Sequence, residues 1–115
     1  MNYLAIGSVV ELQHEDVQVM IIGRGIVYSQ HGNKDLYDYR GCIYPYGFTE
    51  KSDILFNSND ITKILFMGYQ SPLEDDVQDK LLAARKKFLA DRNKKGVTTK
   101  SKDPMQRLLA EKGMD

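Results

Sequence analysis

The chain of 115 residues has few of the residues on which chemistry or disulfide formation usually depends: one cysteine, two histidines and no tryptophan. A single cysteine, Cys42, cannot form an intramolecular disulfide, which fits a reducing compartment. No stretch approaches the roughly 18 consecutive apolar residues of a membrane span. Residues 1–7 also lack the basic start of a secretion signal. We therefore expect a cytoplasmic protein with no direct membrane insertion.

The residues that could bind a metal or catalyse a reaction are scattered. His14 and His31 lie in predicted turns, with no Cys/His spacing around them. Cys42 has no nucleophile motif, and a small core residue is the simpler interpretation. The carboxylates within residues 75–79 lie at a predicted helix start, where the helix dipole accounts for them. We predict no enzymatic activity, no cofactor, no metal and no small-molecule substrate.

The charges sum to zero but are unevenly distributed. Residues 1–79 contain 5 Lys/Arg and 12 Asp/Glu, a net charge of −7, whereas residues 80–115 contain 11 Lys/Arg and 4 Asp/Glu, a net charge of +7. This asymmetry is typical either of a basic interaction tail or of a solvated helix with a basic outer face.

The composition also sets the expected domain boundaries. We predict a single domain over residues 1–92, followed by a flexible basic tail over residues 93–115. Within the tail, Asp103 can cap a short helix whose apolar side comprises Met105, Leu108 and Leu109. Such a helix is too short to be stable alone, so it would need a surface on which to dock.

Apolar runs separated by turn residues predict strands in the first two thirds of the chain. Val10 and Leu12 share one face of the first strand, and Gly23–Gly25 indicates a bulge in the second. Residues 29–36 predict a polar loop, and Pro45 ends the third strand. The expected strands cover residues 6–12, 17–28, 36–44, 54–56 and 61–69, with a short helical turn over 58–62.

A helix is predicted over residues 72–92. Ser71 can cap it, Pro72 suits its first position, and Glu74 completes a capping box. Apolar residues recur along one face at Leu73, Val77, Leu81, Ala84 and Phe88. The fold class is therefore α+β: a small, mostly antiparallel sheet of about five strands, packed by one C-terminal amphipathic helix.

Residues 37–48 contain four of the seven tyrosines, one of the four phenylalanines and the only cysteine. A buried tyrosine needs a partner for its hydroxyl group, whereas an exposed tyrosine is a favoured binding anchor. The segment is therefore either a core strand and turn or a recognition surface, and the two interpretations are compatible. The candidate partner-binding residues are Tyr37, Tyr39, Tyr44, Tyr46 and Phe48, with Leu108 and Leu109 as a second contact.

Nucleic-acid binding is an alternative, because strand tyrosines can stack on bases and the basic tail can follow phosphates. The acidic part of the chain counts against it, since Asp35, Asp38 and Asp53 would repel a phosphate backbone beside the tyrosines.

Five blocks in order carry a family resemblance: Leu4–Leu12, Val19–Arg24, Tyr37–Gly47, Leu55–Ile61 and Phe66–Tyr69. Together they resemble a small family of Gram-positive bacterial proteins that is catalogued as a domain of unknown function. Members of that family are encoded near type VII secretion genes, often beside toxins with an LXG-type N-terminal domain. The resemblance covers about residues 4–90 and carries no catalytic residues over.

The resemblance implies a cytoplasmic accessory protein that binds a protein partner, either a secreted toxin or a secretion component. We expect a non-enzymatic chaperone or adaptor for an LXG-type toxin. An immunity protein that binds the toxin's catalytic domain is the alternative within protein binding.

Overall fold

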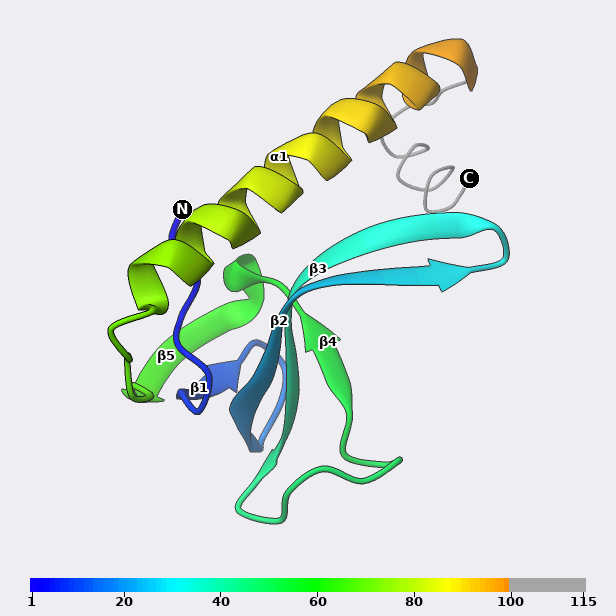
Figure 1. The fold of residues 1–115 in the computed structure, drawn as a ribbon. Coiled ribbons are helices and arrows are strands. Elements are labelled where there is room, and N and C mark those ends of the chain that lie inside the picture. The colour runs from blue at the N-terminus through cyan, green and yellow to red at the C-terminus, as the bar shows by residue number, and fades with distance from the viewer. Residues whose placement is uncertain (100–115) are drawn as a thin grey trace. The chain divides into compact units, whose positions relative to one another are not determined.

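The computed structural model describes the backbone of residues 1–99 and the side chains of residues 1–92. Five strands form one sheet in the order β4-β3-β2-β1-β5 (Figure 1). The pairs β1–β2, β1–β5 and β3–β4 are antiparallel, and β2 and β3 form a hairpin. The elements are β1 (Val9–Leu12), β2 (Gln18–Gln30), β3 (Asn33–Tyr44), β4 (Ile54–Phe56), the 3-10 helix η1 (Ser58–Asp60), β5 (Ile61–Phe66) and α1 (Glu74–Thr99). This arrangement confirms the α+β fold class.

The β2–β3 hairpin is longer than expected, and the polar loop predicted over residues 29–36 is wrong. Strand β2 continues to Gln30 and β3 begins at Asn33. Only His31 and Gly32 remain between them, with φ angles of 53° and 82°. Two successive residues with positive φ make the tight turn whose twist matches that of the flanking strands, so the polar residues on either side extend the ladder.

The hydrophobic core lies between the inner strands, the N-terminal segment and the start of α1. Its buried members are Tyr3, Val10, Leu12, Val19, Ile21, Tyr39 and Phe56. As predicted, Val10 and Leu12 share a face of β1 and both lie in this cluster. Leu81 and Leu82 of α1 pack against the same cluster, so the first two turns of the helix cover this part of the sheet.

Helix α1 begins two residues later than predicted and ends later. Because the helix starts at Glu74, Leu73 precedes it and is exposed rather than part of its apolar face. Ser71 Oγ accepts the backbone N–H of Leu73 at 3.1 Å, one residue before the helix begins. The Glu74 carboxylate bonds Arg24 and Gln78, so the predicted capping box does not form. The helix continues to Thr99, beyond the expected end at residue 92.

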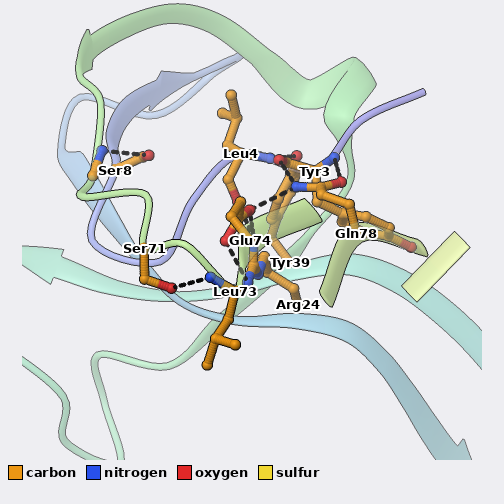
Figure 2. A network of polar contacts seen from close by, with 10 residues as sticks. Tyr3, Leu4, Ser8, Arg24, Tyr39, Ser71, Leu73, Glu74 and Gln78 are labelled. Carbon is orange, nitrogen blue, oxygen red and sulfur yellow. Dashed lines mark hydrogen bonds and ion pairs between the residues drawn. The ribbon is translucent and has the colours of Figure 1, made fainter. Parts of the chain in front are cut away.

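The Glu74 side chain pairs with β2. Its carboxylate accepts hydrogen bonds from Arg24 Nη1 at 2.7 Å and from Gln78 Nε2 at 2.8 Å (Figure 2). Gln78 also bonds both backbone groups of Tyr3, accepting its N–H at 2.9 Å and donating to its carbonyl at 2.7 Å. Arg24 Nη1 reaches the carbonyl of Leu4 at 3.3 Å. This polar network, defined by Tyr3, Leu4, Arg24, Glu74 and Gln78, attaches the N-terminal segment and β2 to the start of α1.

The chain divides into two compact units. The first comprises Met1–Ile26 and Tyr37–Leu82, and the second comprises Val27–Leu36 and the chain from Ala83 onward. The core and the polar network belong to the first unit. Within the second, Arg92 and Asp35 form an ion pair at 3.2 Å. The predicted domain boundary at residue 92 stays a prediction.

Candidate protein-binding surface

The aromatic segment begins inside the core. Tyr39 is 1% exposed. Its ring lies edge-on to Tyr3, with centroids 5.8 Å apart, and tilted against Phe56 at 5.4 Å. Its hydroxyl oxygen accepts the backbone N–H of Leu4 at 2.8 Å, which satisfies the polar end of a buried ring. Tyr39 therefore has a structural role, and the binding surface that we define below leaves it out.

The residues around Tyr39 fix β3 to the connection before β5. The backbone N–H of Asp38 donates to Asn57 Oδ1 at 2.8 Å, and Asp38 Oδ2 accepts the N–H of Ser58 at 2.9 Å. Asp38 is buried, so these bonds satisfy polar groups that water cannot reach. Tyr37, two residues before Tyr39 in β3, is half-buried.

The second half of the segment is a turn that exposes its aromatic side chains. The peptide bond between Tyr44 and Pro45 is cis, and Gly47 has a φ of 95°. The N–H of Gly47 donates to the carbonyl of Ile43 at 2.9 Å and closes the turn. Tyr44 is 45% exposed, Tyr46 85% and Phe48 55%. We call these three side chains the aromatic turn.

The side chains of Ser52 and Arg40 contact the aromatic turn and its flanking residue. The N–H of Ile43 donates to Ser52 Oγ at 2.6 Å. The Arg40 guanidinium lies 5.3 Å from the centroid of the Phe48 ring, within the range of a cation–π contact. The same guanidinium donates two hydrogen bonds of 2.8 Å to the Asp53 carboxylate. Those bonds hold the pKa of Asp53 below its ordinary value.

The structure thus separates the predicted binding residues. Tyr44, Tyr46 and Phe48 lie together at the end of β3 and are exposed, Tyr37 is half-buried and Tyr39 is in the core. Strand alternation could not show this difference, because Tyr37 and Tyr39 point the same way but only Tyr39 lies over Phe56. Leu108 and Leu109 lie outside the described residues.

A second apolar surface was not predicted. Strand β5 exposes Ile64, Leu65 and Phe66, and Met67 and Tyr69 continue the exposed run. The signal was present in the sequence, since Ile61–Tyr69 has one charged residue, Lys63, and no carboxylate. The sequence predicts a strand here, but it does not indicate which strands pair with it, so it did not show that β5 is a sheet edge.

The residue types considered for metal binding or catalysis lie apart in the part of the chain that the structure describes. There, no group of three or more His, Cys, Asp or Glu residues is placed to hold a metal ion. Cys42 is a buried free thiol. Both histidines, His14 and His31, occupy left-handed turn positions, with φ angles of 63° and 53°. Among residues 1–99, no helix has the length and apolar character to span a membrane.

The comparisons with known proteins give a family and no function. Neither the curated proteins nor the solved structures include a match to this chain. The family described as Domain of unknown function (DUF4176) matches residues 3–77. The matched region contains all five strands, the aromatic turn and the first residues of α1. The chain therefore belongs to the family Domain of unknown function (DUF4176).

Proposed function

We propose that this protein is a non-enzymatic, cytoplasmic accessory protein of type VII secretion, a chaperone or adaptor that binds an LXG-type secreted toxin. The observation that carries the protein-binding part is the aromatic turn, where Tyr44, Tyr46 and Phe48 are exposed together on a hydrogen-bonded turn. The secretion context rests on the family resemblance of the sequence blocks given above.

Affinity would come mainly from burying the aromatic turn. Tyrosine offers a large rigid surface with a polar end and is enriched among residues that dominate binding energies. Since the turn is already closed by the Gly47–Ile43 and Ile43–Ser52 hydrogen bonds, little backbone ordering is needed on binding, which favours affinity.

Charge would steer the encounter. Residues 1–79 carry a net charge of −7, so a partner segment with basic residues among its apolar ones is attracted over several ångströms. We propose a helical region of the toxin as that segment. An acidic surface of this kind repels nucleic acid, which leaves nucleic-acid binding to the basic residues after position 80.

The test measures binding of the full chain to the two halves of an LXG-type toxin encoded beside its gene. These halves are the N-terminal LXG-type region and the C-terminal catalytic domain. An adaptor binds the N-terminal half. Binding to the C-terminal half instead would identify an immunity protein, and binding to neither half would disprove both ideas.

Variants then test whether the aromatic turn is the surface. Tyr46→Ala with Phe48→Ala should weaken binding at least about 30-fold, because two exposed anchors of this kind contribute about 1 kcal/mol or more each. Tyr28→Ala is the matched control, since Tyr28 has the same 45% exposure as Tyr44 but lies in the β2–β3 hairpin. Equal losses in the control and in the double variant would place the surface elsewhere.

A further inference from the structure

Strand β5 is a sheet edge with one charged residue and no proline. It pairs with β1 on one side and, in the strand order β4-β3-β2-β1-β5, is the last strand, so residues 1–99 provide no strand on its other side. Isolated edge strands in monomers are usually short, interrupted by proline or crowded with charges. The six residues Ile61–Phe66 contain one lysine, no carboxylate and no proline. The register shifts against β1 at Leu65 and Thr62 increase the twist of the strand. They place no charged side chain that would prevent another strand from pairing with its unpaired edge.

The exposed apolar side chains lie on both faces of the sheet. Directly paired residues share a face. Ile64 pairs with Val10 and Phe66 pairs with Val9. Both valines are buried, and because they are adjacent in β1 their side chains lie on opposite faces of the sheet. Ile64 is nevertheless 47% exposed and Phe66 62% exposed. A partner docked flat on one face would cover only one of these side chains, whereas a strand added alongside β5 covers both.

The occupant must therefore be a strand with apolar side chains on both faces and little charge. A second β5 has those properties. The stretch Ile61–Leu73 contains no carboxylate, in a region (residues 1–79) that contains 12 of them. Because this stretch has no negative charge, two copies of the acidic domain repel each other least when they meet along it. Lys63, its only charged residue, lies opposite Glu11 of β1 in the same chain.

We propose that two copies of this chain pair through β5, antiparallel and about a two-fold axis, so that their five-stranded sheets become one continuous sheet. Since the opposite edge, β4, has only three residues, and Asp53 next to it is paired with Arg40, the pairing closes at the dimer and does not propagate. The proposal does not depend on the secretion function, because the aromatic turn belongs to the other side of the sheet.

The first test is the mass of the full chain in solution, by sedimentation velocity over about 1–100 μM, the range in which interfaces of modest area associate. We expect a species of twice the chain mass of 13.2 kDa that dissociates on dilution. Phe66→Asp should weaken the dimer at least about 100-fold, because a charge on an edge strand blocks pairing. Tyr46→Asp, the same change in the aromatic turn, should leave the dimer intact.

A second test holds even if Phe66→Asp destabilises the fold. Cys42→Ala removes the only cysteine, and single cysteines are then placed at positions 62, 63, 64 and 65. A two-fold antiparallel pair brings at most one position directly opposite its own copy, and its sequence neighbours lie next closest to theirs, so oxidation should give a covalent dimer most readily at one or two of the four positions. Asn33→Cys, in the hairpin, is the control and should give no covalent dimer. A monomer over the whole range, open-ended growth, or cross-linking that is equal at every position would overturn the proposal.

Discussion

The two ends of the sheet differ in what they expose. At the β4 side, the chain leaves β3 through a turn closed by hydrogen bonds, three aromatic side chains are exposed, and the edge strand has only three residues. At the β5 side, the strand exposes apolar side chains on both faces together with an unpaired backbone edge. The two surfaces therefore suit different occupants, an irregular or helical partner at the aromatic turn and a strand at β5.

The charged residues reinforce this difference. Arg40 contacts the Phe48 ring and forms an ion pair with Asp53, so a pair of charged side chains lies beside the aromatic turn. A polar rim around aromatic anchors is typical of interfaces between proteins that exist separately. Along β5, the single Lys63 faces Glu11 of the neighbouring strand, and the rest of the edge is uncharged. An edge of this composition suits the strand pairing proposed above.

The largest expected change in the free energy of unfolding comes from Tyr39, the buried member of the aromatic segment. Tyr39→Ala should lower the free energy of unfolding by about 4 kcal/mol, because it opens a cavity among Tyr3, Phe56 and the core valines. Tyr39→Phe should cost about 1 kcal/mol, since only the hydrogen bond from Leu4 is lost. Urea unfolding monitored by circular dichroism measures both.

Tyr46→Ala is the comparison for that series. With its side chain exposed, it should change the free energy of unfolding by less than about 0.5 kcal/mol, while it weakens partner binding. A Tyr46→Ala variant as unstable as Tyr39→Ala would mean that the aromatic turn is structural and would remove the basis of the proposed surface.

Tyr39 and Tyr46 also show how far sequence reasoning extends. The strands, the helical turn near residue 58 and the α+β class follow from local patterns, which act over a few residues. The placement of Tyr39 in the core depends on Phe56 and Tyr3, which are distant in sequence. The same limit explains β5: a strand's composition indicates that it is apolar, but its position in the strand order depends on which strands pair with it.

The Arg24–Glu74 pair was missed for a related reason. A capping box explained Glu74 locally, and nothing within one helical turn of it indicated a partner 50 residues away. The loop predicted over residues 29–36 is wrong for a different reason. Polar composition predicts a loop, but a two-residue turn at His31 and Gly32 lets the polar residues on either side extend the strands.

The second prediction concerns Gly68, at the β5 end of the sheet. Gly68 follows β5, and its N–H donates to Ser8 Oγ at 2.9 Å. A Cβ atom at this position would overlap the carbonyl oxygen of Ile6. Gly68→Ala should therefore lower the free energy of unfolding by about 3 kcal/mol and displace the end of β5. Urea unfolding measures the loss, and sedimentation should show a weaker dimer.

Gly47→Ala is the matched control at the aromatic turn. A Cβ atom there meets nothing within 4 Å, so only the positive φ of 95° opposes the change, at about 1 kcal/mol. Losses of equal size at the two glycines would contradict the close packing of Gly68 against Ile6 and, with it, the fixed position of β5.

The third prediction concerns the polar network, which belongs to neither surface. Glu74→Gln should lower the free energy of unfolding by about 2 kcal/mol at pH 7, because it leaves the largely buried guanidinium of Arg24 without its charged partner. Since the network contacts neither the aromatic turn nor the β5 edge, partner binding and dimer mass should both stay unchanged in the folded variant. Asp76→Asn is the control, because its ion pair with Lys80 is exposed and should contribute less than about 0.5 kcal/mol.

The same variant predicts a pH dependence with a definite sign. Hydrogen bonds from Arg24, and then from Gln78, hold the pKa of Glu74 below its ordinary value of 4.5. A carboxylate with a lowered pKa in the folded state stabilises the fold fully above its unfolded pKa, and this contribution is lost as the pH falls through the folded pKa. The stability difference between the wild-type protein and Glu74→Gln should therefore be constant near neutral pH and shrink below about pH 4.5. Unfolding in urea at intervals between pH 7 and pH 3 would show it, and a difference that does not change with pH would mean that the charge of Glu74 contributes nothing beyond its hydrogen bonds.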